Sequence, residues 1–200
     1  MDVNSRHLVF GLGNPGPRYH RTRHNVGWRV VEALAARWRA RETWAGPVYR
    51  EWTAGRDGRD VHLVLPLTFM NVSGAALAAW MARHGDAREG LLAVSDDVYL
   101  PLGMLRFRPG GSSGGHRGLE SLEAALAGDG WARLRLGVGA VEGAGALKEH
   151  VLETFGPDDA DQVETMITRA ADAVERWLDD GLAVAMNRYN RRATQETEEP

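Results

Sequence analysis

Three short motifs bring together histidine and asparagine side chains that can move protons or hold a polar substrate. They are Gly11-Leu-Gly-Asn14-Pro-Gly16 leading into Tyr19 and Thr22-Arg-His24-Asn25, then Thr68-Phe-Met-Asn71, then Gly110-Gly-Ser-Ser-Gly-Gly-His116. Imidazoles exchange protons near neutral pH, and carboxamides offer donors and an acceptor without a charge. Each motif lies where an apolar, strand-like run gives way to a Gly-rich or polar connection, the usual place for functional groups on an α/β scaffold. The motifs therefore predict an active site.

The first motif also matches the glycine pattern of dinucleotide-binding proteins, in which a helix begins inside the loop and points at the pyrophosphate. Here Pro15 and Pro17 interrupt the loop, and residues 19–23 delay the helix. An acidic residue that ends the next strand is also hard to place. The sequence therefore argues against a nicotinamide or flavin cofactor, and absorbance of the purified protein would test for a bound flavin.

A different use of this loop fits its residues better. The turn at Asn14 would hold a carboxamide at the carboxyl end of the first strand, and the loop would then return to place His24 at the start of a helix. Both side chains would face one cleft. A single histidine near a helix start is more often a cap or a core residue, so the neighbouring motifs carry this interpretation.

Apolar spacing predicts alternating strands and helices. Strands are expected at residues 8–13, 48–53, 61–65, 91–95, 104–108 and 134–139, and helices at residues 25–38, 72–84, 119–126 and beyond residue 157. This alternation predicts the α/β class: one domain, residues 1–190, with a mixed twisted β-sheet flanked by helices on both faces. Residues 191–200 are polar and aperiodic, which predicts a flexible tail.

Composition excludes several classes of protein. The 200 residues contain no cysteine, so disulfides and thiolate chemistry are excluded. The net charge of -3 argues against coating nucleic acid through bulk positive charge, although a local basic patch remains open. No run is apolar enough for a signal peptide or a membrane span, so we expect a soluble, cytoplasmic protein without membrane contact.

The motifs together resemble those of the bacterial peptidyl-tRNA hydrolase family, from about residue 8 through residue 189. Besides the three motifs above, the resemblance rests on Pro66, Val72-Ser-Gly74, Asp96-Asp97, Leu100-Pro101, Gly103, Gly118-Leu119, residues 133–139, Val151-Leu152 and Phe155. Several motifs in the family's order are more specific than one glycine pattern.

The resemblance implies an enzyme that hydrolyses the ester between a peptide, or an N-blocked amino acid, and the 3′-terminal ribose of tRNA. This reaction recycles tRNA from prematurely released peptidyl-tRNA, which places the protein in translation and ribosome rescue. The resemblance further implies a monomer that works without a cofactor or metal. An ester needs neither if an activated water is well placed, and the sequence shows no dense cluster of metal ligands.

The resemblance also assigns roles to single residues. His24 matches the general base that activates the water, and Asp96 matches the carboxylate that orients this histidine. Asn14 matches the residue that distinguishes blocked from free aminoacyl-tRNA. Asn71 matches a substrate contact near the ester, and its amide could donate to the developing oxyanion. Capping the following helix is an alternative role for Asn71.

Further substrate contacts are expected around the cleft. They are Tyr19, Phe69, Met70, His116 and Arg117. The aromatic rings would provide surfaces for the terminal ribose or adenine, and the methionine an adaptable wall for the peptide. Phe69 and Met70 could equally be core residues.

One position departs from the family. Where the family usually has His-Asn-Gly, this chain has His116-Arg117-Gly118. Arg117 removes a neutral amide and adds a long cation, which could reach a tRNA phosphate instead. This departure alone favours a second hypothesis, a catalytically silent RNA-binding relative like the chloroplast splicing factors that share this fold. The presence of His24, Asp96 and both asparagines weighs against it.

Two pairs of arginines on neighbouring predicted strands suggest phosphate contacts. Arg106 and Arg108 alternate on one strand, and Arg133 and Arg135 on another, so each pair projects to one face. We expect the four to bind tRNA phosphates, with a solvated strand face as the alternative. The loop at residues 110–115 that follows the first pair could gate the cleft or simply form a turn.

Overall fold

The computed structural model describes residues 6–140 and 147–190, so the tail predicted at residues 191–200 lies outside the described residues. In chain order the elements are β1 (His7–Gly11), α1 (Val26–Arg37), β2 (Arg41–Ala45), β3 (Tyr49–Arg56), β4 (Arg59–Pro66), α2 (Ser73–His84), β5 (Leu91–Asp97), β6 (Leu105–Arg108), α3 (Arg117–Leu126), β7 (Ala132–Gly137), α4 (Leu147–Leu152) and α5 (Ala160–Tyr189). Within these described ranges, none of the helices combines the length and the apolar character needed to cross a bilayer.

The strands of the described residues form one mixed sheet in the order β2-β3-β4-β1-β5-β7-β6. The central strand β1 is parallel to both β4 and β5, and β5 is parallel to β7. The antiparallel strands lie at the two sides of this parallel centre. The carboxyl ends of β4, β1, β5 and β7 therefore meet at one edge of the sheet, where α/β proteins place their ligands.

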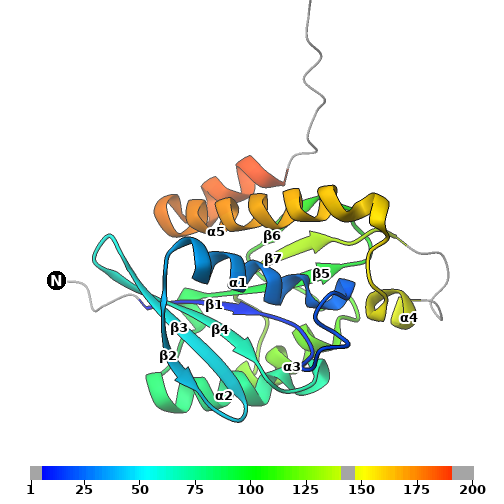
Figure 1. Cartoon of the computed structure of the whole chain (residues 1–200). Coiled ribbons are helices and arrows are strands. Elements are labelled where there is room, and N and C mark those ends of the chain that lie inside the picture. The colour runs from blue at the N-terminus through cyan, green and yellow to red at the C-terminus, as the bar shows by residue number, and fades with distance from the viewer. Residues whose placement is uncertain (1–5, 141–146, 191–200) are drawn as a thin grey trace, which may run out of the picture.

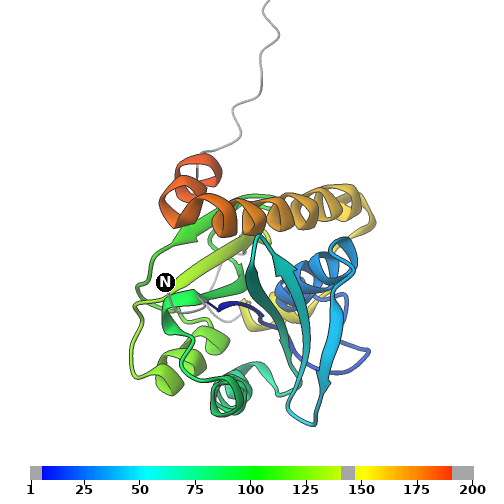
Figure 2. The same ribbon diagram turned by 90° about the vertical axis from the view of Figure 1, so that its left-hand side faces the viewer.

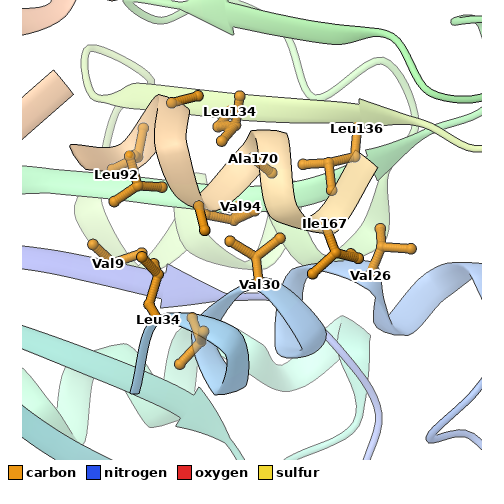
Figure 3. Close-up of a cluster of buried hydrophobic side chains, with 14 of the residues drawn as sticks. Val9, Val26, Val30, Leu34, Leu92, Val94, Leu134, Leu136, Ile167 and Ala170 are labelled. Carbon is orange, nitrogen blue, oxygen red and sulfur yellow. The ribbon is translucent and has the colours of Figure 1, made fainter. Parts of the chain in front are cut away.

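Helices cover both faces of the sheet, as predicted. Helices α1 and α5 lie on one face, and α2 and α3 lie on the other (Figures 1 and 2). Alternation along β1 serves both layers, because Val9 packs under α1 whereas Leu8 and Phe10 pack toward α2 and α3. Figure 3 shows strand side chains such as Val94 and Leu134 against Val30 of α1 and Ala170 of α5.

Gly11 of the first motif and Gly27 of α1 allow this helix to lie close to the sheet. A Cβ atom on Gly11 would lie 2.4 Å from the carbonyl oxygen of Gly27, and one on Gly27 would lie 2.3 Å from that of Val94. The helix itself begins only at Val26, far beyond the glycine loop. A dinucleotide site would need a helix that starts within the loop, so these glycines serve packing instead.

Two elements were not predicted. β2 has an exposed pattern without apolar alternation and exists because it pairs with β3 across a register shift near Glu42. α4 is six residues long and contains no buried residue, so its sequence carries no amphipathic signal. α5 was predicted, but its path bends at Gly181, whose φ of 82° is not helical.

Candidate active site

The polar residues of the three motifs meet at the carboxyl edge of the parallel strands. Asn14 follows β1, Asp96 lies near the end of β5, and the segment Met70–Val72 follows β4. His24 and His116 precede α1 and α3. A pocket of about 270 Å³ opens at this edge and is lined by both histidines and by Asp96. The sheet order thus brings together side chains that are far apart in the sequence.

His24 is held by Asp96. Its Nδ1 lies 2.7 Å from Oδ1 of Asp96, which places a proton on Nδ1 and leaves Nε2 with the lone pair when the ring is neutral. Nε2 makes no hydrogen bond within the described part of the chain, and the His24 side chain is 12% exposed and lines the pocket. The ring therefore presents an unoccupied basic nitrogen next to solvent, which is the arrangement a general base requires.

His116 shares the same carboxylate oxygen in a fixed tautomer. Its Nδ1 accepts hydrogen bonds from the backbone N–H groups of Gly118 and Leu119, at 3.1 and 3.2 Å, and so caps α3. Because Nδ1 is an acceptor, the proton of the neutral ring is on Nε2, which donates to Oδ1 of Asp96 at 2.9 Å. Both nitrogens of His116 are thus occupied, so it positions Asp96 rather than offering a second base.

Asp96 is buried and remains ionised. Burial alone would raise the pKa of this carboxyl, but the facing imidazoles of His24 and His116 and their hydrogen bonds outweigh it and hold the pKa well below its ordinary range. The carboxylate can therefore stabilise positive charge on His24 when that ring takes a proton.

The chain segment before α1 is tied to the segment before α5, which fixes the backbone at His24. The Arg23 N–H donates to the carbonyl of Glu153 at 3.0 Å, and the Arg23 guanidinium donates to the carbonyl of Thr154 at 2.9 Å. The same guanidinium lies 5.0 Å from the centre of the Phe155 ring. The ring contact gives a structural reason for the aromatic residue at 155, whereas the two hydrogen bonds use only backbone carbonyl groups.

The carboxamide of Asn14 is oriented by its neighbours. Its Oδ1 accepts from the Met70 N–H at 2.8 Å, so its Nδ2 group faces away from that contact. Asn25, to which the sequence analysis assigned no role, is fully buried and holds the backbone of Asn14 through two hydrogen bonds of 2.9 Å. Because Nδ2 has no partner among the residues that the structure describes, Asn14 can act as a donor to a substrate.

The residues expected to contact substrate divide into buried and exposed ones. Phe69 is 56% exposed and meets Tyr19 edge-on, with 6.3 Å between ring centres. Met70 is buried in the core, as the alternative interpretation allowed. Asn71 is exposed and caps no helix, because α2 starts without a side-chain cap. Arg117 is exposed, begins α3 and lines the pocket.

Three of the four predicted phosphate-binding arginines line a second pocket. Arg106, Arg108 and Arg135 surround a volume of about 410 Å³ together with Asp97, whose carboxylate pairs with Arg135 at 3.2 Å. Asp97 and Arg135 also line the pocket of His24, so the two pockets adjoin.

The prediction for Arg133 is wrong. Its side chain is fully buried, 3.1 Å from the Glu123 carboxylate and 4.1 Å above the Trp131 ring. Strand alternation placed it correctly on the same face as Arg135, but α3 and Trp131 cover that end of the face. Arg133 therefore ties α3 to β7 and cannot reach a phosphate.

The glycine loop at residues 110–115 forms a turned connection between β6 and α3. The hydroxyls of Ser112 and Ser113 accept from backbone N–H groups two residues ahead, and the guanidinium of Arg135 donates to the carbonyl of Ser112 at 2.7 Å. Three of its glycines have positive φ. Gating of the cleft by this loop stays a prediction.

The residues that could hold a metal ion differ from what the sequence suggested. No dense ligand cluster is visible along the chain, yet the fold brings ligand atoms of His24, Asp96 and His116 within 4.8 Å of one another. Both imidazole rings already form hydrogen bonds with Oδ1 of Asp96. These hydrogen bonds account for the close approach of the three side chains without a metal ion. Catalysis without a metal stays a prediction.

The pocket also contains residues that the motifs did not single out. Tyr99 is 67% exposed and lies at its wall with Lys148 and Val151. Lys148 is the only lysine of the chain, and α4 brings it to the pocket. Of these three residues only Val151 could have been found from the sequence, because Val151-Leu152 is part of the family resemblance. Tyr99 and Lys148 belong to no motif or periodic pattern.

Known proteins match this chain over nearly its whole length. The family model described as peptidyl-tRNA hydrolase matches residues 8–198. A peptidyl-tRNA hydrolase of Methylacidiphilum infernorum is 41% identical over 189 residues, covering 92% of this chain and 97% of the relative. One of Symbiobacterium thermophilum is 42% identical over 185 residues, covering 92% and 98%.

A solved structure agrees in fold. The crystal structure of peptidyl-tRNA hydrolase from Acinetobacter baumannii superimposes with a TM-score of 0.87 at 30% identity, covering 95% of this chain and 97% of that one. The resemblance stated from the motifs and the predicted fold class are both confirmed. By sequence and by fold, this chain belongs to the peptidyl-tRNA hydrolase family.

Proposed function

We propose that this chain hydrolyses the ester between a peptide, or an N-blocked amino acid, and the 3′-terminal ribose of tRNA, with His24 as the general base. The observation that carries the proposal is the contact of 2.7 Å between His24 Nδ1 and Asp96 Oδ1, which leaves Nε2 free at the pocket. Family membership supplies the substrate class. The products would be a free peptide and a reusable tRNA.

The reaction needs one proton carrier. Nε2 of His24 takes a proton from a water molecule as the water oxygen attacks the ester carbonyl, and Asp96 stabilises the resulting imidazolium. The tetrahedral intermediate then expels the ribose oxygen, which takes the proton back from Nε2. The buried Asp96 keeps its charge throughout.

Two carboxamides would hold the reacting group. The Nδ2 group of Asn14 is oriented as a donor by the Met70 contact and would bind a carbonyl oxygen of the blocked amino acid. A free ammonium there would meet a second donor and stay badly solvated, which disfavours unblocked aminoacyl-tRNA. The exposed amide of Asn71 would donate to the developing oxyanion.

Exchanging the donor of Asn14 for an acceptor tests this role. Asn14→Asp keeps an oxygen for the Met70 N–H but removes the Nδ2 donor and adds a charge. We expect kcat/KM for N-acetyl-aminoacyl-tRNA to fall by roughly 100-fold, because a buried hydrogen bond is lost and a carbonyl meets a carboxylate. Comparing blocked and unblocked substrates checks the selectivity; an unchanged ratio would contradict the assignment.

The tRNA would lie across the adjoining arginine pocket. Arg106 and Arg108 are half-buried, and they reach this pocket beside Arg135. Planar guanidinium groups bind phosphate oxygens in pairs, so a phosphate near the acceptor end would find donors here. The exposed ring of Phe69, the residue before the Met70 N–H that binds Asn14, gives a stacking surface for a base.

Salt dependence distinguishes phosphate contacts from a solvated strand face. For Arg106→Gln/Arg108→Gln we expect the slope of log affinity against log salt to fall by about 0.7–0.9 for each lost contact. Binding of tRNA at several salt concentrations measures it. The matched control is Arg88→Gln, which changes an exposed arginine that pairs with Asp86 and lines neither pocket. An equal change in that variant would refute phosphate binding by Arg106 and Arg108.

Arg117 is proposed to contact tRNA rather than the ester. It is exposed at the rim of the pocket, where the family usually has asparagine. We expect Arg117→Asn to raise KM by roughly 3- to 10-fold, the effect of one exposed charge contact, with a smaller change in kcat. Steady-state kinetics measure both, and equal changes in kcat and KM would count against this role.

The decisive test is cleavage of N-blocked aminoacyl-tRNA beside the unblocked substrate. Rapid cleavage of the blocked form alone would support the hydrolase. Binding without cleavage would favour the silent RNA-binding relative and point to Arg117. A monomer in the cytoplasm completes the proposal; sedimentation with and without tRNA checks the monomer.

A further inference from the structure

A second group of histidine and carboxylate side chains lies away from the catalytic pocket. Glu51 of β3, His62 of β4 and His84 at the end of α2 each offer a ligand atom within 4.8 Å of the others. His62 Nδ1 lies 2.6 Å from Oε1 of Glu51, and His84 Nε2 lies 3.3 Å from Oε2. None of the three lines the pocket of His24.

The Glu51 carboxylate is buried without a permanent cation beside it. It is 1% exposed, and in the described ranges only the two histidines lie within ion-pair distance. Burial opposes its ionisation, but hydrogen bonds from His62 and Trp80 outweigh that and lower the pKa of the carboxyl. The negative charge of this buried carboxylate is therefore not balanced by a neighbouring group that always carries a full positive charge.

One nitrogen of the cluster has no hydrogen bond. His84 Nε2 is buried, and no described group has the geometry to bond it, although Oε2 of Glu51 is only 3.3 Å away. The neutral imidazole ring has the lone pair that metal ions bind, and a buried polar atom without a partner is uncommon.

Trp80 leaves one carboxylate oxygen available. Its indole N–H donates to Oε1 of Glu51 at 3.1 Å, and its ring stacks on His84 with 4.6 Å between centres. A hydrogen bond from a residue that does not itself bind the metal, such as Trp80, orients a ligating carboxylate. The stacked indole ring also holds the imidazole of His84 in place.

We propose that Glu51, His62 and His84 bind one divalent transition-metal ion, with zinc the best match. Two imidazoles and a carboxylate form a ligand set that zinc accepts in tetrahedral coordination, with water as the fourth ligand. The His84 side chain is 20% exposed although its Nε2 is buried, so the site lies directly beneath the surface of the protein.

The existing distances require little adjustment. Zinc bonds of 2.0–2.2 Å separate neighbouring tetrahedral ligands by about 3.3 Å, the spacing that His84 Nε2 and Glu51 Oε2 already have. His62 Nδ1 would give up its short hydrogen bond and move away from the carboxylate by about 0.7 Å. The ion would fasten the end of α2 to β3 and β4, and α2 is the helix that follows Asn71.

Metal binding by untagged, EDTA-treated protein tests the site, with Co²⁺ as the spectroscopic probe and Zn²⁺ as competitor. We expect one tetrahedral Co²⁺ per chain, displaced by zinc. Zinc at about 100 times its Kd should raise Tm by roughly 5–10 °C. Cleavage of N-blocked aminoacyl-tRNA should persist in EDTA, because none of the three proposed metal-binding residues lines the catalytic pocket.

Variants locate the bound ion. His84→Ala and Glu51→Gln should each weaken Co²⁺ binding by roughly 10- to 100-fold or more, while Tm in EDTA reports whether they fold. His20→Ala is the matched control, since it removes an exposed histidine that pairs with Glu32. Loss of binding in His24→Ala but not in His84→Ala would assign the metal to the catalytic histidines. That result, or no binding by the parent protein, would overturn the proposal.

Discussion

Replacing His24 by alanine is expected to lower kcat for N-blocked aminoacyl-tRNA by roughly 10²- to 10⁴-fold, the usual contribution of a general base. The reason is that Nε2 of His24 is the unoccupied basic nitrogen of the pocket, whereas both nitrogens of His116 are used. KM should change little, because the proposed tRNA contacts are made by other residues, the arginines of the adjoining pocket and Arg117. Single-turnover cleavage together with tRNA binding measures the two effects separately.

Two controls sharpen this expectation. His20→Ala removes an exposed histidine near in sequence and should leave kcat unchanged. His24→Ala should also change how the residual rate depends on pH, because the proposed proton acceptor is gone. Residual activity within a few-fold of the parent would contradict the assignment of His24 and turn attention to His116.

Replacing Asp96 by asparagine is expected to lower kcat by roughly 10³- to 10⁴-fold, the scale known for the equivalent change in serine-protease triads. One oxygen of Asp96 accepts from both His24 and His116. The amide oxygen of an asparagine can still accept from both rings, but it supplies no negative charge for the imidazolium. The geometry would survive while His24 loses the charge that stabilises its protonated form.

The double variant tests whether the two residues act as a unit. If Asp96 works through His24, His24→Ala/Asp96→Asn should be about as slow as the slower single variant, because such effects are not additive. If the fold-loss in kcat of the double variant instead equals the product of the two single losses, Asp96 contributes independently of His24. Circular dichroism of each variant separates these outcomes from unfolding.

Asp96 should also shape the dependence of stability on pH. Its pKa is lower in the folded protein than in the unfolded chain, so its ionised form stabilises the fold above the ordinary carboxyl range. This contribution is fully present above about pH 5, and it is lost as pH falls through the ordinary carboxyl range, near about 4, and on toward the lower pKa of the folded protein. Urea unfolding between about pH 5 and pH 3 should show a shallower pH dependence for Asp96→Asn; equal slopes would contradict it.

Local patterns in the sequence determined most of the elements and the edge of the sheet that carries the site. Apolar runs ending at Asn14 and Asp96 identified two strand ends, and alternation put Arg133 and Arg135 on one face of their strand. These conclusions depend only on neighbours along the chain, because periodicity reports backbone conformation and facing direction. β2 was missed because its exposed residues carry no such period.

Only the tertiary structure decided what surrounds each side chain. Alternation could not show that Trp131 and Glu123 bury Arg133 while Arg135 stays at a pocket. It also could not show that His24 and His116, 92 positions apart, share one oxygen of Asp96. Nor did spacing reveal that Glu51 meets two histidines from β4 and α2. Burial, tautomer and ligand geometry depend on elements distant in sequence, and the packing of the sheet and its helices is what brings those elements into contact.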